Sequence, residues 1–264
     1  MRNKLGPGLA LAAGFAGAMM QCLALVTAFD ATTHLPNPDT PILWVQLIYC
    51  ILVAVAALLW GRALTRDTEL TWHGQWLGQS RFSAAVGGAS GALVLVGGCG
   101  MAIQSFLNWR FSYDREDLAA AIVGALLALS GVCFFLLSLR ERRQSALSLL
   151  PGFAVCFWLI LFYHTNARDP VVFHYAFLLL ALMAAAVALY YQACLCFARP
   201  KPARTVGFTL IAAVFCLQVM PAADDLGARL VLAGLGVWMC QRLAFLLSEP
   251  GTDPENESTE GESK

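Results

Sequence analysis

The sequence contains little charge for its length. Lys, Arg, Asp and Glu together make up 13% of its 264 residues, and their charges cancel to a formal net charge of zero. A typical soluble domain has about 25% charged residues, with which it covers its surface. The small charged fraction therefore argues against a soluble globular protein. The zero net charge gives no indication of a nucleic-acid partner.

Apolar side chains take the place of the missing charge, and they occur in long runs. They make up 59% of the sequence; residues 42–60 include one strongly polar side chain, Gln46, and residues 171–197 carry no formal charge. A helix needs about 20 mostly apolar residues to span the hydrocarbon core of a bilayer. Because the backbone must satisfy its own hydrogen bonds there, the runs predict helices and a lipid bilayer around them.

We predict an all-α fold, a polytopic transmembrane helical bundle of eight spans within residues 1–247. The predicted spans are 5–29, 42–62, 82–107, 118–139, 146–164, 170–197, 206–222 and 226–247. The seventh span is short and ends at Pro221, so its full crossing is an open question. Residues 248–264 are acidic and poor in apolar side chains, which is typical of a disordered tail.

The distribution of Lys and Arg predicts the orientation of the bundle. With the N-terminus placed in the cytoplasm, thirteen of the 17 basic residues fall on the cytoplasmic side and four on the other. Those four are Arg110, Arg115, Arg168 and Arg229. Because cytoplasmic loops carry the excess of Lys and Arg, we expect both termini in the cytoplasm. The prediction is a multi-pass protein of the cytoplasmic membrane.

The sequence lacks the residue patterns on which enzymes and metal proteins depend. All nine cysteines fall inside predicted spans, and the four histidines form no metal-binding motif. No Asp, Glu or Lys lies at mid-depth of a span, and the two arginines of the last span, Arg229 and Arg242, are expected to reach the membrane interfaces. We therefore predict no catalytic residues, no metal and no cofactor.

Gly88-Ala89-Ser90-Gly91 resembles the Gly-x-Ser-Gly nucleophile motif of rhomboid intramembrane proteases. Such a serine needs a histidine base from another helix, and no later span has a histidine beside glycines. The alternative is a helix-packing face, because Gly87 and Gly91 are four residues apart and small residues let membrane helices approach closely. We interpret the segment as a packing face.

Glutamines are the most polar uncharged residues inside the predicted spans. The six are Gln21, Gln46, Gln104, Gln192, Gln218 and Gln241. Uncharged amides can hydrogen bond from one helix to another, or they can line a path for a neutral solute. We favour the bridges between helices and keep the solute path as the alternative.

Polar residues also gather around the predicted turn between the fifth and sixth spans. His164, Arg168, Asp169 and His174 form a candidate solute-binding corner there. The same residues suit a structural role, because Asp169 can cap the sixth helix with Pro170 in its first turn, and histidines can anchor at the interface. Capping and anchoring are the favoured interpretation, and binding is the alternative.

A resemblance appears in the same stretch. Pro151, Phe157-Trp158-Leu159, Asp169-Pro170 and Tyr175 resemble a pattern in small multi-span bacterial membrane proteins. The resemblance covers the fifth and sixth spans and implies a location in a bacterial cytoplasmic membrane. That group has no established activity, so the resemblance implies none.

Together these features favour a membrane protein without enzymatic chemistry. One alternative is a permease or transporter subunit for a neutral or weakly charged small molecule, which would use the glycine-rich helices and the glutamines. The other is a sensory or envelope protein that acts on a membrane-protein partner through its basic loops and acidic tail. A polar cavity at mid-depth would favour the permease, and a solid bundle with one exposed groove would favour the partner protein.

Overall fold

The part of the chain that the structure describes folds into eight long helices. The structure, a computed structural model, describes residues 5–28, 41–65, 81–139, 145–167, 172–197, 201–223 and 225–247, and within these ranges it contains helices and no strands. The helices are α1 (Leu5–Thr27), α2 (Ile42–Thr65), α3 (Arg81–Ser112), α4 (Arg115–Leu139), α5 (Ser145–Asn166), α6 (Val172–Cys196), α7 (Pro202–Val219) and α8 (Leu226–Leu247). A 3-10 turn, Met220–Ala222, follows α7.

All eight helices are long and apolar enough to cross a membrane, which confirms the predicted all-α fold and the predicted number of helices of this length among the described residues. The seventh is long enough as well, because its apolar segment runs over Pro202–Ala222. It begins four residues before the predicted start, with Pro202 in its first turn, where a missing backbone N–H costs nothing. The acidic tail, 248–264, lies outside the described residues.

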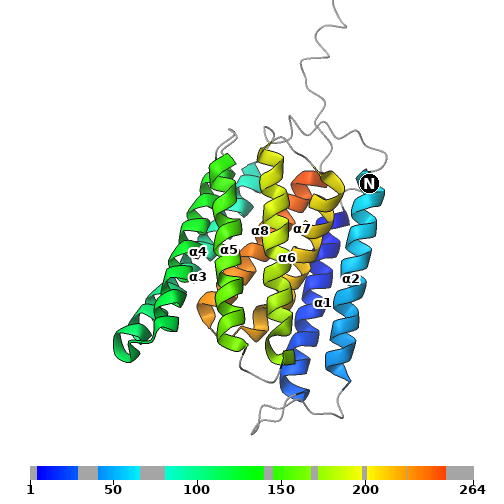
Figure 1. The fold of residues 1–264 in the computed structure, drawn as a ribbon. Coiled ribbons are helices and arrows are strands. Elements are labelled where there is room, and N and C mark those ends of the chain that lie inside the picture. Colours follow the sequence, from blue (N-terminus) through cyan, green and yellow to red (C-terminus); the bar gives the residue numbers. More distant parts are fainter. Residues whose placement is uncertain are drawn as a thin grey trace, which may run out of the picture.

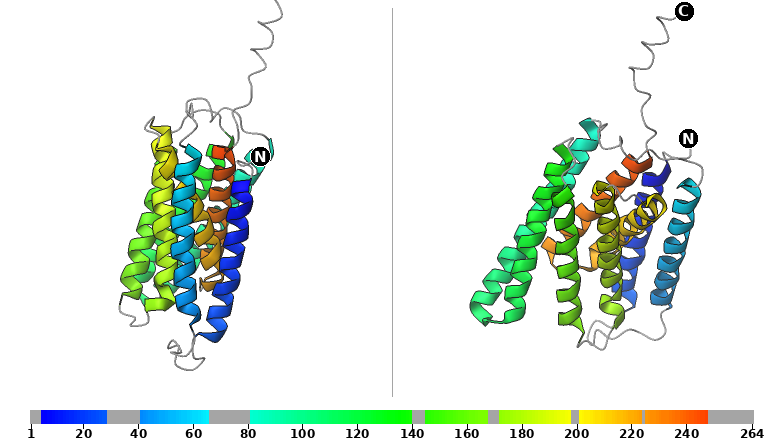
Figure 2. Two further views of the ribbon diagram at one scale, coloured as in Figure 1. Left: turned by 90° about the vertical axis from the view of Figure 1, so that its right-hand side faces the viewer. Right: turned by 45° about the horizontal axis from the view of Figure 1, so that its top comes forward.

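The helices run alternately up and down, and α7 and α8 lie in the middle of the bundle (Figure 1). In the apolar segments of α7 and α8, 72% of the residues are buried, against 22% in α2 and α5. We call the end of the bundle at which α1 begins and α8 ends the upper end, as it is drawn in Figure 1. Figure 2 shows α1 and α2 on one flank of the central pair and α3 and α4 on the other.

Glycines bring the backbones of α3 and α4 into direct contact. A Cβ atom at Gly91 would lie 2.8 Å from the carbonyl oxygen of Gly131, and one at Gly124 would lie 2.8 Å from Cα of Ala102. Ser90 is fully buried and donates its hydroxyl proton to the carbonyl oxygen of Gly87 at 2.8 Å. The predicted packing face is therefore confirmed.

The prediction that residues 108–117 form a loop between the third and fourth spans is wrong. Only Tyr113 and Asp114 separate α3 from α4, and Tyr113 takes a left-handed backbone conformation with φ 54°. The polar residues there cap the helices instead of breaking them: the hydroxyl of Ser112 donates to Asp117 at 2.7 Å, and Asp114 accepts from the backbone N–H of Glu116 at 3.1 Å. The result is a long helical hairpin that projects at the lower left of Figure 1.

Candidate functional site

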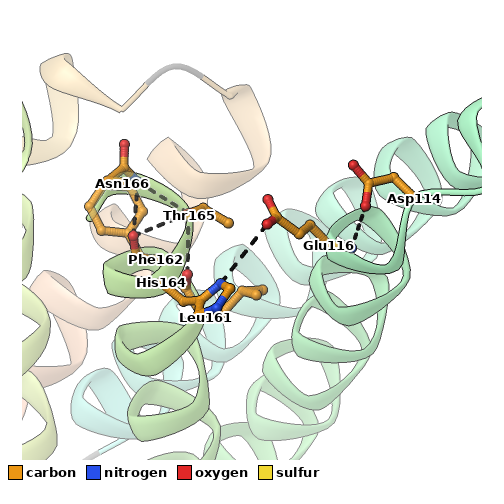
Figure 3. Close-up of polar contacts among 7 residues, drawn as sticks. All are labelled: Asp114, Glu116, Leu161, Phe162, His164, Thr165 and Asn166. Carbon is orange, nitrogen blue, oxygen red and sulfur yellow. Dashed lines mark hydrogen bonds and ion pairs between the residues drawn. The ribbon is translucent and has the colours of Figure 1, made fainter. Parts of the chain in front are cut away.

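Of the four residues in the predicted solute-binding corner, the structure describes the side chain of one, His164. His164 lies near the lower end of α5, while Arg168, Asp169 and the side chain of His174 lie outside the described residues. The imidazole Nδ1 of His164 lies 4.0 Å from Oε1 of Glu116 on α4, and its side chain is 68% exposed (Figure 3). An exposed contact of this kind contributes at most about 1 kcal/mol. The binding corner and the proposed cap at Asp169 stay predictions.

The cysteines that the structure describes are free thiols. Cys50, Cys133, Cys216 and Cys240 are buried among the helices, and Cys22, Cys99 and Cys156 are exposed on the outside of the bundle. Among the described residues, no three His, Cys, Asp or Glu side chains come together as they would around a metal ion. The buried cysteines therefore act as small packing residues between helices.

Five of the six glutamines are buried, and each of these hydrogen bonds to another helix, which confirms the predicted bridges. The bridges are Gln46 (α2) to Gln21 (α1), Gln218 (α7) to Cys50 (α2), Gln192 (α6) to Thr209 (α7) and Trp238 (α8), and Gln241 (α8) to Ser83 (α3). The exception is Gln104, which is exposed on α3.

Three of these amides form one group with a thiol between α1, α2 and α7, which we call the amide cluster: Gln21, Gln46, Cys50 and Gln218. Gln46 donates from Nε2 to Oε1 of Gln21, and Gln218 donates from Nε2 to Sγ of Cys50 at 3.3 Å. Gln46 is 0% exposed, yet its own Oε1 atom has no hydrogen-bond partner among the described residues. A buried acceptor left in this state costs about 1–3 kcal/mol.

A cavity of about 360 Å³ lies above the amide cluster, between the same three helices. Its lining is wholly apolar: Leu9, Ala13, Val53, Ala56, Ala57, Trp60, Leu210 and Val214. Trp60 marks its upper limit, where a Cβ atom at Gly6 would lie 2.9 Å from the indole ring. At its lower limit the Tyr49 hydroxyl donates to the carbonyl oxygen of Ala13 at 2.6 Å. The Tyr49 side chain thus crosses from α2 to α1 between the cavity and the amide cluster.

A second polar group lies toward the upper end of α8 and corrects a prediction. Arg242 was expected to reach the interface, but it is 4% exposed, and its guanidinium lies over the Trp238 ring at 4.1 Å. Trp238 in turn stacks on Phe134 at 4.3 Å and donates from Nε1 to Oε1 of Gln192 at 3.2 Å. The cation–π contact and the stack keep the arginine inside the bundle.

The space beside Arg242 is small. The adjoining cavity measures about 20 Å³ and is lined by Phe134, Leu137, Ser148, Leu189, Gln192, Trp238 and Arg242. A volume of roughly 10–15 Å³ suffices for one water molecule, so this cavity has room for a water and for no larger solute. We therefore assign this second group to the joining of α4, α6, α7 and α8, and take the α1–α2–α7 cavity as the candidate site.

Sequence reasoning identified the amides of this site but missed Tyr49, Cys50 and Trp60. A signal for them was present, because Gln46, Tyr49, Val53, Ala56 and Trp60 recur every three or four residues along one face of α2. The uniformly apolar run around them hides the pattern. Comparisons with protein-family models, with curated proteins and with solved structures find no match to this chain.

Proposed function

We propose that the protein is a permease or permease subunit for a small neutral molecule that is largely apolar and carries a hydrogen-bond donor. Its path runs through the cavity and the amide cluster between α1, α2 and α7. The observation that carries the proposal is the fully buried Oε1 atom of Gln46, which accepts no hydrogen bond among the described residues. A donor group on a solute would satisfy it and recover the cost of its burial.

The size and chemistry of the cavity support this solute class. Pockets for small molecules measure about 300–1,000 Å³ and combine an apolar lining with a few polar groups. The cavity has this size and an apolar lining, with a volume of about 360 Å³, and the Tyr49 hydroxyl beside it bonds to the lining residue Ala13. A charged solute would lose its hydration here without gaining an opposite charge from the lining residues.

The attachment of α1 and α2 supports passage between them. Each packs mainly on α7, and they contact each other little. The upper part of α2 is close to α7, because a Cβ atom at Gly61 would lie 2.6 Å from the carbonyl oxygen of Ala203. On α1, a Cβ atom at Gly14 or at Gly17 would instead meet flexible side chains of α7, those of Leu217 and Gln218. A small tilt of α1 away from α2 would open the path, with adjustment confined to the side chains at which α1 meets α7 and α8.

We further propose that the protein resides in a bacterial cytoplasmic membrane with both termini inside and performs no enzymatic reaction. The bias of thirteen basic residues against four supports the orientation, and the resemblance of the fifth and sixth spans supports the location. A reporter protein that is active only in the cytoplasm, fused after Ser248, tests the orientation. We expect this fusion to be active.

The swelling of proteoliposomes in propane-1,2-diol, with glycerol as the more polar comparison, is followed by light scattering and tests transport. We expect the protein to accelerate swelling over protein-free liposomes, and we expect Gln46→Leu to remove most of the acceleration. Gln104→Leu is the matched control, because Gln104 is exposed on α3 and should leave the rate unchanged. Swelling at the protein-free rate for both solutes, or equal rates for Gln46→Leu and the wild type, would contradict the proposal.

A further inference from the structure

Tyr49 is placed where it could separate the apolar cavity from the amide cluster. It lies four residues before Val53, which lines the cavity, and three residues after Gln46, which belongs to the cluster. Its hydroxyl bonds to the carbonyl oxygen of Ala13, itself a lining residue of the cavity. A solute that moves from the cavity to the cluster must therefore pass this hydrogen bond.

Breaking the bond between Tyr49 and Ala13 costs little free energy at the Ala13 carbonyl group. Ala13 lies within the helix Leu5–Thr27, so its carbonyl oxygen also accepts the backbone N–H of the residue four positions later. A carbonyl oxygen has two lone pairs, and Tyr49 uses the second. Loss of the tyrosine bond thus leaves no unsatisfied carbonyl on α1, and the cost falls on the Tyr49 hydroxyl alone.

A second acceptor for this hydroxyl exists on the same helix. Residues three apart on a helix are neighbours, and a helical side chain leans over the turn that precedes it. Gln46 lies three residues before Tyr49 on α2, and its buried Oε1 atom accepts no bond among the described residues. Oε1 of Gln46 is therefore a second acceptor that can take the Tyr49 hydroxyl when it leaves Ala13.

We infer that Tyr49 is a two-position gate, closed on the carbonyl oxygen of Ala13 and open on Oε1 of Gln46. The inference rests on the proposed function, and it specifies how the path is regulated. In the closed position the cavity ends at Tyr49. In the open position the gap between α1 and α2 connects the cavity with Cys50 and the rest of the amide cluster, and the solute donor replaces the tyrosine at Gln46.

Cys50 is a built-in reporter of this gate. It lies next to Tyr49 in the chain and is 5% exposed, so a thiol reagent can reach it only when the gate is open. The other cysteines supply references in the same molecule. Cys22 and Cys156 lie on the outside of the bundle, so their rates should be the same in every variant, while Cys216 is 0% exposed and should react in none.

The test measures the rate at which N-ethylmaleimide modifies Cys50 in the full-length protein in liposomes, read by mass spectrometry of the peptides. Gln46→Met removes the second acceptor, so Cys50 should react more slowly than in the wild type, by about two- to tenfold, the factor that a typical hydrogen bond represents. Tyr49→Phe keeps the ring but removes the hydroxyl bond of both positions, so Gln46→Met should have no further effect in that background. Tyr163→Phe, at an exposed tyrosine of α5, should change nothing.

The direction of the change distinguishes gating from damage to the fold. A misfolded variant would expose Cys50 and Cys216 together and speed both reactions, whereas a gate held closed slows Cys50 alone. A Cys50 rate that is unchanged or faster in Gln46→Met, or that Gln46→Met slows as much in the Tyr49→Phe background, would overturn the gate. The proposed function can fail separately: liposome swelling that does not depend on Gln46 refutes the permease even where Cys50 responds to Gln46→Met.

Discussion

The two flanks of the bundle are joined in different ways. On one flank, α3 and α4 meet backbone to backbone at glycines along much of their length, and α3 continues this contact onto α8, where a Cβ atom at Gly97 would lie 2.6 Å from the carbonyl oxygen of Gly227. On the other flank, α1 and α2 are joined by side chains, the Gln21–Gln46 amides and the Tyr49–Ala13 bond. We call the first the glycine-packed side and the second the amide-bridged side.

The difference follows from the physics of helix association in a bilayer. Lipid tails are as apolar as leucine, so helices gain nothing from burying apolar surface and depend on close packing and on hydrogen bonds. Close packing of backbones is rigid, because a glycine interface has no side chain that can adjust. A few hydrogen bonds between amides leave room for a cavity and for a second arrangement, and the cavity is found on that side.

The largest effect is expected where a tryptophan is truncated within the central helices. Trp238→Ala should lower the free energy of unfolding by about 3–5 kcal/mol, because the ring is buried and stacks on Phe134. Trp60→Ala, which removes the wall of a cavity that already exists, should cost less than half as much. Thermal unfolding in detergent measures both, and equal losses would contradict the comparison of the two sides.

A methyl group on the glycine-packed side should have the next largest effect. Gly131→Ala should cost about 1–3 kcal/mol, because the new Cβ would lie 2.7 Å from Cα of Leu95 and from the carbonyl oxygen of Gly91. Gly8→Ala is the matched control on α1, where a Cβ would meet nothing within 4 Å. The same unfolding assay should show no loss for Gly8→Ala, and a harmless Gly131→Ala would show that the contact is not rigid.

Smaller effects are expected within the amide cluster. Gln218→Leu should cost about 0.6–1.7 kcal/mol, the range measured for hydrogen bonds between membrane helices. Gln46→Leu should be close to neutral, because it removes one bond to Gln21 together with a buried acceptor that has no partner. Unfolding of the two variants side by side tests the expectation. A larger loss for Gln46→Leu than for Gln218→Leu would mean that Gln46 is a structural residue.

The smallest effect is expected at the lower end of the bundle. Glu116→Gln should change stability by less than about 1 kcal/mol, because its contact with His164 is exposed on both sides and 4.0 Å long. Thermal unfolding in detergent measures this stability, with and without salt at about 0.5 M, a concentration that screens exposed charges. The variant and the wild type should unfold alike under both conditions. A clear loss would restore His164 as part of a functional corner.

The number of helices and their approximate places could be predicted from the sequence, because runs such as 42–60 leave no other option in a bilayer. The ends were harder. Residues 108–112 read as a loop because they are polar and aromatic, but Ser112, Asp114 and Asp117 use their side chains to cap the helices. Whether a polar residue breaks a helix or caps it depends on side-chain directions that composition does not contain.

The candidate site was predicted in part. The amide bridges were expected, because a buried amide in a bilayer needs a partner, although the partners could not be named. The cavity could not be predicted, because it depends on the angle at which α1 and α2 meet α7. The burial of Arg242 was missed for a similar reason: the aromatic column of Trp238 and Phe134 is built from two helices that are far apart in the sequence.

The central claim is that α1 and α2 can separate while α3 and α4 cannot, and distances between paired spin labels measure this most directly. Suitable positions are exposed on the outside of the bundle: Phe15 with Leu52 for α1 and α2, and Ile103 with Ile122 for α3 and α4, in a background whose native cysteines are replaced by alanine. We predict two distances for the first pair, with the longer one depleted by Gln46→Met, and a single narrow distance for the second. A single narrow distance for both pairs, unchanged by Gln46→Met, would contradict the account.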